Sequence, residues 1–164
     1  MEGLDRMVFS IVFDVDGMPP RKDGGHSMWN KDKEVNKLID LRKQLDATLQ
    51  KHQIPTPITD YIKLKVEIYL PEKYLEKSDI DNLVGGICDG IQKANYKSKL
   101  NGKYIQFEGT SVHPFNSFLC DDSRVLELDV KKIINEKKTF YRVLIESIDL
   151  NEIRAEKLHN NDIF

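Results

Sequence analysis

The chain has 164 residues, a formal charge of −2 and an ordinary globular composition, with 40% hydrophobic and 32% charged residues. No apolar run approaches the roughly 18 residues of a membrane span, and the N-terminus lacks the basic and apolar parts of a signal peptide. Cys88 and Cys120 have no CxxC or zinc-like spacing, so we expect reduced core thiols in the cytoplasm. We also expect one domain over residues 1–164, with a core at about 7–150 and a tail at 151–164.

Hydrophobic periodicity predicts six main elements. A β-rich run comes first, and a stripe of apolar residues at steps of three and four then indicates a helix. An alternating strand, a second helical stripe and two further strand-like runs follow. Their expected bounds are residues 7–16, 31–52, 61–70, 79–95, 125–134 and 139–148. The order β-α-β-α-β-β predicts an α+β domain with two main helices on a mixed sheet.

Two long connections and the C-terminus complete the chain. Turn residues predict a loop over residues 18–30, whose Arg21 and Lys22 can order on DNA, although a loop without a role is the alternative. Residues 95–120 are expected to be an extended loop with a short strand at 103–107. Residues 151–164 are expected to form a short helix with a frayed tail.

Acidic residues gather at the start of the second predicted helix and just before the strand at 125–134. In a helix interior two residues two apart do not face each other, but at a helix start Asp79 and Asp81 can converge. The positive end of the helix dipole stabilises carboxylates there. Mg²⁺ prefers several oxygen ligands, so these two acids with Asp122 predict a site for metal-assisted phosphodiester chemistry.

Each acidic pattern also has a purely structural interpretation. Aspartate at a helix start commonly caps the helix, and the Asp121-Asp122-Ser123 run commonly forms a turn. Neither pattern is specific alone, and only their joint occurrence in this element order favours the metal site. Asp89, two turns beyond Asp81, is interpreted as a solvated or ion-paired acid, with a remote metal ligand as the alternative.

Three glycines lie inside the second predicted helix: Gly85, Gly86 and Gly90. Each costs about 1 kcal/mol relative to alanine in a helix interior. They lie off the expected apolar stripe, so core packing does not explain them. Close approach of a backbone, from DNA or a partner subunit, is one interpretation, and tolerated local instability is the other.

Charge is unevenly distributed along the chain. Residues 67–89 hold six acids and two lysines, whereas residues 93–103 hold four lysines and no acid. Residues 131–142 hold five basic residues and one acid. An acidic centre bordered by basic segments suits a metal site beside phosphate-contacting surface, and ordinary solvated charge is the alternative.

Together these patterns resemble the RusA-type Holliday junction resolvases over most of residues 8–148, in the same element order. The residues that carry the resemblance are Asp79-x-Asp81-Asn82-Leu83, Asp89, Asp121-Asp122-Ser123-x-Val125 and Gly17-x-Pro19-Pro20-Arg21-Lys22.

The resemblance implies a homodimeric RusA-like endonuclease that cuts branched DNA, namely four-way junctions, by paired nicks. It further implies that Asp79, Asp81 and Asp122 are both the metal ligands and the catalytic residues. The implied ion is Mg²⁺, with Mn²⁺ as the alternative, and no membrane is involved. Two copies in a dimer would address two opposed strands, which fits twofold symmetry.

Two departures from the family pattern bear on activity. The family has a catalytic lysine one helical turn after the second aspartate, where this chain has Gly85. Lys77 or Lys93 is a candidate substitute. The second departure is the segment at 95–120, which is longer than the family's short turn. Its basic and aromatic groups suit phosphate contact and base stacking, and a surface insertion is the alternative.

The basic residues expected to contact DNA lie before, within and after the acidic region. They are Arg21, Lys22, Lys77, Lys93, Lys97, Lys99 and Lys103. Two alternatives to the endonuclease remain open: a junction-binding module of the same fold that has lost full activity with the lysine, and a metal-binding interaction protein unrelated to DNA.

Overall fold

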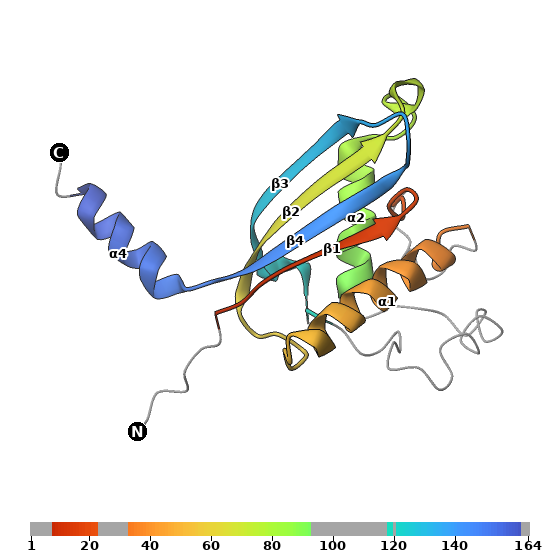
Figure 1. The fold of residues 1–164 in the computed structure, drawn as a ribbon. Helices are drawn as coiled ribbons and strands as arrows, with labels where there is room; N and C mark the ends of the chain where they lie inside the picture. Colours follow the sequence, from red (N-terminus) through yellow and green to blue (C-terminus); the bar gives the residue numbers. More distant parts are fainter. Residues whose placement is uncertain (1–7, 23–32, 93–117, 120, 162–164) are drawn as a thin grey trace.

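The computed structural model describes residues 8–22, 33–92, 118–119 and 121–161. Within these ranges the chain forms three α-helices, two 3₁₀ turns and a four-stranded mixed sheet (Figure 1). The elements in chain order are β1 (Ser10–Asp16), α1 (Val35–Lys51), β2 (Tyr61–Leu70), η2 (Glu72–Tyr74), α2 (Ile80–Ile91), η5 (Asp122–Arg124), β3 (Val125–Ile134), β4 (Phe140–Ile148) and α4 (Leu150–Asn161). The predicted α+β class and β-α-β-α-β-β order are confirmed.

The strands lie in the order β1-β4-β2-β3. β4 is antiparallel to both of its neighbours, whereas β3 is parallel to β2. The short connection at 135–138 therefore does not make a hairpin, because β2 lies between the two strands that it joins. The backbone N–H of Asn135 donates to the carbonyl of Leu70 (2.9 Å) as the chain passes the end of β2. The predicted pair of late strands exists, but its members do not pair with each other.

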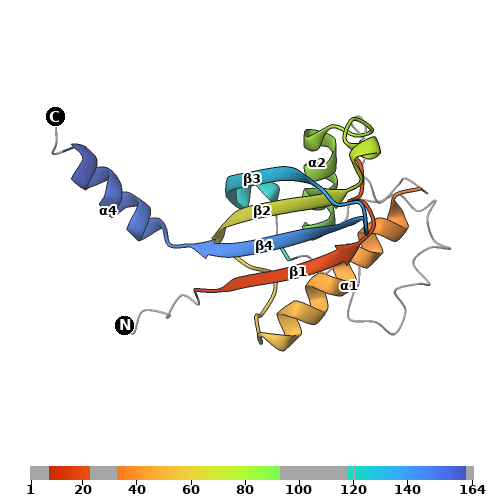
Figure 2. The ribbon, with the colours of Figure 1, turned by 45° about the horizontal axis from the view of Figure 1, so that its top comes forward.

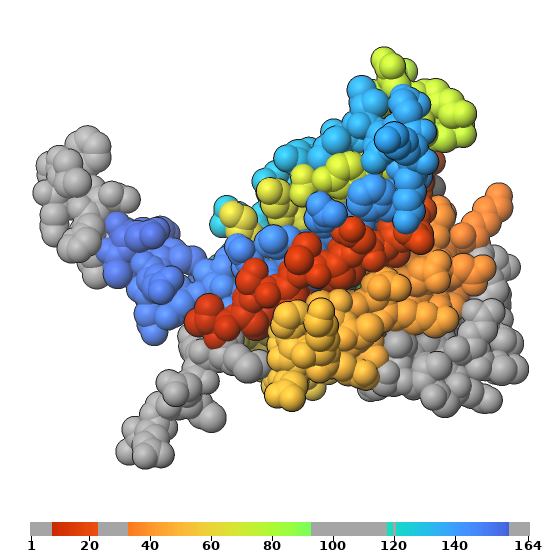
Figure 3. Space-filling view, in the orientation of Figure 1, coloured from red at the N-terminus to blue at the C-terminus, as the bar shows by residue number. Residues whose placement is uncertain are grey.

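One face of the sheet carries the core. β2 alternates strictly between half-buried and fully buried residues, from Ile62 to Leu70, and its cross-strand partners Val143 and Ile145 are fully buried on the same face. α1 and α2 cover this face. α2 lies behind the strands in Figure 1, and α1 runs along β1 in Figures 1 and 2. The other face, turned toward the viewer in Figure 3, carries no helix among the described residues. Apolar alternation along β2 and the helical stripes thus fix which side is covered.

Two of the three glycines of α2 are buried in packing contacts. A Cβ on Gly90 would stand 2.5 Å from Cδ2 of Leu41 on α1, and a Cβ on Gly86 would stand 1.8 Å from the carbonyl oxygen of Pro20. The expectation that core packing does not explain these glycines was therefore wrong for both. An apolar stripe records side chains, so it overlooks helix faces that pack because they have none.

The C-terminal end of α2 is fixed by α1. The buried guanidinium of Arg42 donates from Nη1 to the carbonyl oxygens of Gly90 (2.9 Å) and Gln92 (3.3 Å). A cation at this end satisfies carbonyls that the helix itself leaves open. Burial lowers the pKa of Arg42 to about 10.

The C-terminal helix was also predicted. α4 projects away from the sheet in Figure 1. The expected short strand at 103–107 and the rest of the long connection lie outside the described residues, as does Cys120. No helix among the described residues is long and apolar enough to span a membrane.

Candidate functional site

The start of α2 presents two carboxylates to solvent. Asp79 is the N-cap residue, in extended backbone geometry, and Asp81 lies in the first turn. Both side chains are exposed. Asp79 occupies the capping position, as the structural interpretation expects, but its carboxylate makes no capping hydrogen bond. Two negative charges thus lie at the positive end of a helix with their oxygens still accessible.

A lysine of the edge strand holds the turn that leads into α2. The Nζ of Lys132 donates to the carbonyl oxygens of Leu75 and Ser78, both at 2.5 Å. The short η2 turn precedes this point and directs the chain from β2 back toward the helix. At least one member of the basic run at 131–142 therefore has a structural role, because it positions the residue just before Asp79.

The aspartate pair before β3 divides into two roles. Asp121 caps the η5 turn, since its Oδ1 accepts from the backbone N–H of Ser123 (2.8 Å). Asp122 does not have this capping role. Partial burial raises the pKa of Asp122, and the neighbouring acids Asp121 and Asp89 raise it further, whereas Lys22 opposes them. A carboxylate in this environment would be stabilised by a bound cation.

Asp122 lies beside the third turn of α2. The backbone N–H of Leu119 donates to the carbonyl of Ile91 (2.9 Å), which brings this segment to the C-terminal half of the helix. Burial raises the pKa of Cys88 to about 11, and Asp122 and Asp89 contribute to the rise. Asp89 and Asp122 are therefore near enough to Cys88 to influence its ionisation.

The first and third turns of α2 thus carry separate acids. Eight residues separate Asp81 from Asp89, which is about 12 Å of helical rise. Among the described residues, no group of three or more histidine, cysteine, aspartate or glutamate side chains lies close enough to hold a metal ion. The set of Asp79, Asp81 and Asp122 stays a prediction.

Asp89 is ion-paired. Its side chain is only 8% exposed, and its Oδ1 lies 3.0 Å from the Nζ of Lys22. The ion-paired interpretation is confirmed and the solvated one is wrong, because Asp89 faces the segment that follows β1. The backbone N–H of Lys22 also donates to the carbonyl of Asn82 (3.0 Å). Both the backbone and the side-chain ammonium of Lys22 therefore hold this segment against α2.

A cleft of about 320 Å³ lies between this segment, the start of α1 and the turn before α2. The predicted DNA contacts Arg21 and Lys77 line it, and Nζ of Lys77 lies 4.1 Å from the ring centre of Tyr74. Sequence analysis missed Lys37 and Tyr74, because they join the cleft from other elements and carry no motif. The lining residues are Met18, Pro19, Arg21, Glu34, Lys37, Tyr74, Lys77, Ser78 and Leu83.

The remaining predicted DNA contacts lie in the long connection after α2. Lys93, Lys97, Lys99 and Lys103 are all outside the described residues, so their contribution stays a prediction.

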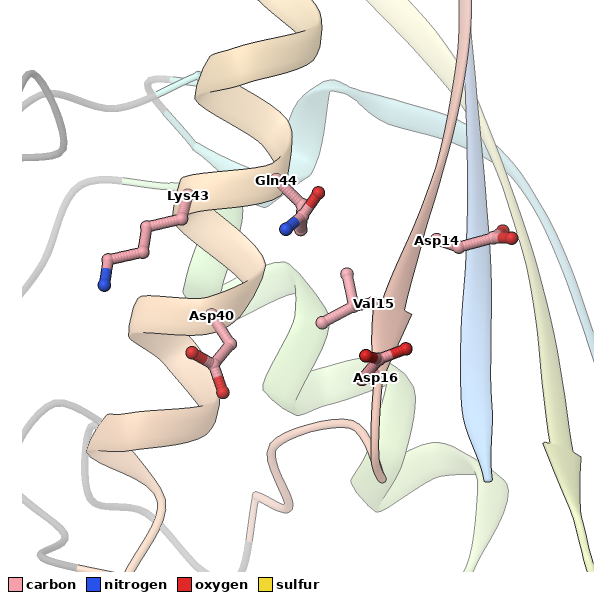
Figure 4. Close-up of a pocket in the computed structure, with 6 residues that line it drawn as sticks. All are labelled: Asp14, Val15, Asp16, Asp40, Lys43 and Gln44. Carbon is pink, nitrogen blue, oxygen red and sulfur yellow. The ribbon is translucent and has the colours of Figure 1, made fainter. Parts of the chain in front are cut away.

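A second hollow opens between α1 and β1 (Figure 4). Two of its acids have basic partners: Asp14 binds Arg142 (2.8 Å) and Asp16 binds Lys138 (2.7 Å). These are cross-strand and loop ion pairs on the surface, so we assign this hollow no catalytic role. Its lining residues are Asp14, Val15, Asp16, Asp40, Lys43 and Gln44.

Comparison with known families gives one match. The model of a family described as endodeoxyribonuclease RusA matches residues 21–98, just under half of the chain. This stretch includes Lys22, Asp79, Asp81 and Asp89, and it ends before Asp122. The resemblance seen in the sequence is confirmed at the level of the family. No curated protein matches the chain.

Proposed function

We propose that this chain, whose residues 21–98 match the RusA endodeoxyribonuclease family, is a member of that family and a Mg²⁺-dependent, structure-selective endonuclease that resolves four-way DNA junctions by paired nicks. One observation carries the proposal beyond the family. The matched segment contains two exposed aspartates at the positive end of α2, and the carboxylate of Asp79 is not used to cap the helix. Acids kept accessible at this position suit an ionic ligand better than a structural role.

Asp79 and Asp81 would hold the metal, with Asp122 as the third carboxylate. The donor set fits Mg²⁺ or Mn²⁺, because every proposed ligand atom is a carboxylate oxygen. When bound, the ion polarises a phosphoryl oxygen and lowers the pKa of the attacking water. Asp122 has weaker support than the other two, since its described neighbours are Asp89 and Cys88.

The DNA would approach along the cleft beside the start of α2. Arg21 and Lys77 line that cleft and would contact phosphates, which position a duplex without reading its sequence. These contacts suit an enzyme that selects a branched shape.

The proposed homodimer would pair two such sites. β3 is an edge strand whose Leu126, Leu128 and Ile134 are each about half exposed, and an apolar edge of this kind favours association with another chain. Sedimentation of the full chain measures whether the protein is a dimer.

The test of the function is cleavage of a labelled synthetic four-way junction, with a linear duplex of the same sequence as the competing substrate. We expect Mg²⁺-dependent paired nicks in the junction. Asp81→Asn should lower the nicking rate by about 1,000-fold or more while leaving junction affinity within a few-fold, because it removes one proposed ligand and keeps the shape. Asp40→Asn, at an exposed aspartate of α1, is the matched control and should cleave normally.

Two results would contradict the proposal in different ways. Tight, salt-dependent junction binding without nicking in Mg²⁺ or Mn²⁺ would identify the junction-binding module instead. Absence of junction binding would favour an interaction protein unrelated to DNA. Normal cleavage by Asp81→Asn would remove this residue from the mechanism.

A further inference from the structure

The side chain of Lys22 crosses α2 at Gly85. Of the three glycines in this helix, Gly85 is the one that faces a side chain of the loop after β1. A Cβ on Gly85 would stand 3.3 Å from Cδ and 3.4 Å from Cβ of Lys22. The aliphatic stem of the lysine therefore lies directly against the bare backbone of Gly85. Any larger residue at 85 would compete with the stem for this space.

The ammonium group of Lys22 is held by a buried acid, on a side chain that is only partly buried. Its Nζ lies 3.0 Å from the carboxylate of Asp89, which is 8% exposed, whereas the lysine side chain is 37% exposed. An ammonium has three N–H donors, and the bond to Asp89 uses one of them. The buried acid thus anchors the ammonium of a side chain that is itself more than one third exposed.

The backbone around Lys22 reinforces this placement. Pro19 and Pro20 are buried, and the N–H of Arg21 donates to Oε2 of Glu34 (2.9 Å). The N–H of Lys22 donates to the carbonyl of Asn82. Because a lysine stem has many rotamers, fixing the backbone and the far end together removes most of its freedom before any ligand binds.

We propose that Lys22 supplies the phosphate-binding ammonium of the active site, reaching across Gly85 from the loop after β1. The inference rests on the proposed endonuclease function. The resemblance leads us to expect a lysine on α2 itself at position 85, and Lys22 fills the space into which such a side chain would extend. Of the two sequence candidates for this role, Lys77 lies over the Tyr74 ring, and Lys93 is outside the described residues.

The step assigned to Lys22 is electrostatic. Water attacks phosphorus and releases a proton to solvent, the bond from phosphorus to the leaving oxygen breaks, and negative charge grows on the phosphoryl and leaving oxygens. The ammonium contacts those oxygens and stabilises the charge, while the leaving oxygen takes its proton from solvent. A positioned donor of this kind contributes about 100-fold or more to a rate.

The first test separates this role from simple neutralisation of Asp89. Lys22→Met keeps an unbranched stem over Gly85 and removes the charge, and Asp89→Asn in the same chain removes the negative charge that Lys22 balances. We expect Lys22→Met/Asp89→Asn to melt near the wild-type temperature and to nick a bound junction about 100-fold more slowly in a single turnover. A wild-type nicking rate in this double variant would overturn the proposal.

The second test moves the lysine. In Lys22→Ala/Gly85→Lys the stem that blocks position 85 is gone, so the new lysine can extend over the same surface, and we expect most of the lost rate to return. The matched control Lys22→Ala/Val84→Lys has the same net charge, but its new lysine projects about 100° further around the helix. Its nicking rate should stay low. Equal rates in the two relocated variants would overturn the proposal.

A binding measurement keeps the inference separable from the endonuclease function. In Ca²⁺, the slope of log affinity against log salt for the junction should fall by about 0.9 in Lys22→Met/Asp89→Asn, which loses one phosphate contact. Its net charge equals that of the wild type, so a general charge effect predicts no change. An unchanged slope would overturn the role of Lys22 even if the wild type cleaves. A reduced slope without wild-type cleavage would retain the phosphate contact and reject the endonuclease.

Discussion

The first and third turns of α2 use acidic residues in opposite ways. Asp79 and Asp81 are exposed at the start of the helix, whereas Asp89 is buried and paired with Lys22 two turns later. Among the described residues, the loop after β1 reaches the first turn through the carbonyl of Asn82, and both carboxylates stay exposed. The middle turn carries the loop after β1 on Gly85 and Gly86, and Asp89 in the third turn binds Lys22 of that loop, so this acid is part of the packing.

This difference predicts which substitutions in α2 should change DNA cleavage without changing the stability of the fold. Changes at the first turn should affect what the helix binds and leave the fold intact. Changes at the middle turn should alter the fold and the position of Lys22 together, because the same contacts serve both. Four further substitutions sharpen the contrast, in order of decreasing effect.

Gly86→Ala should have the largest effect on stability. Its Cβ would stand 1.8 Å from the carbonyl oxygen of Pro20, and a backbone atom cannot rotate away, so the loop must move. Overpacking of this kind costs about 3 kcal/mol, against about 1 kcal/mol gained in helix propensity. We expect a net loss of about 2 kcal/mol, or about 6 °C in melting temperature by calorimetry, together with slower nicking.

Gly90→Ala is the control for this prediction. Its Cβ would meet a methyl group of Leu41 at 2.5 Å, and a side chain can adjust at lower cost than a backbone. It should destabilise less than Gly86→Ala and leave nicking unchanged, because Gly90 packs on α1 and does not contact the loop. A larger loss of stability at Gly90 would show that the loop contact is not the tighter of the two.

Most of the fold could be predicted from the sequence, because periodicity is a local signal. Alternation from Tyr61 to Leu70 predicted the observed bounds of β2. The second apolar stripe located α2 but predicted its end at residue 95 rather than at Ile91. Strand order was not predictable in the same way. The short connection at 135–138 suggests a hairpin, yet β2 separates the two strands, and only long-range pairing decides this.

The candidate site was predictable in part for the same reason. Motif spacing identified Asp79 and Asp81 at the helix start, and the turn signal identified Asp121 and Asp122. Sequence could not assign Lys22 to Asp89, since 67 residues separate them and the contact depends on how the loop packs on α2. The glycines were the available signal, because a helix that tolerates them commonly packs against another backbone.

Gly85→Ala should have an intermediate effect, with stability and activity changing in opposite directions. The new Cβ would lie 3.3 Å from a flexible lysine stem, so a shift of a few tenths of an ångström relieves the contact, while the helix gains about 0.5–1 kcal/mol. We expect a melting temperature that is unchanged or slightly raised and a nicking rate that falls several-fold, because a displaced ammonium fits the phosphate less well. Unchanged nicking would mean that the Gly85 contact does not position Lys22.

Asp122→Asn should have the smallest effect on stability. Partial burial and two neighbouring acids raise the pKa of Asp122 above its ordinary value of 3.8, so its ionised form is disfavoured in the folded chain. Below pH 3.8 Asp122 is protonated in both the folded and the unfolded chain, so its environment does not lower the free energy of unfolding. The loss of stability is fully present once the pH exceeds the pKa of Asp122 in the folded chain. Without divalent ions, the variant should therefore melt slightly higher than the wild type at pH 7, and the gap should close as the pH falls toward 4. Added Mg²⁺ should raise the melting temperature of the wild type more than that of the variant if Asp122 is a metal ligand, and equal shifts would exclude it from the metal site.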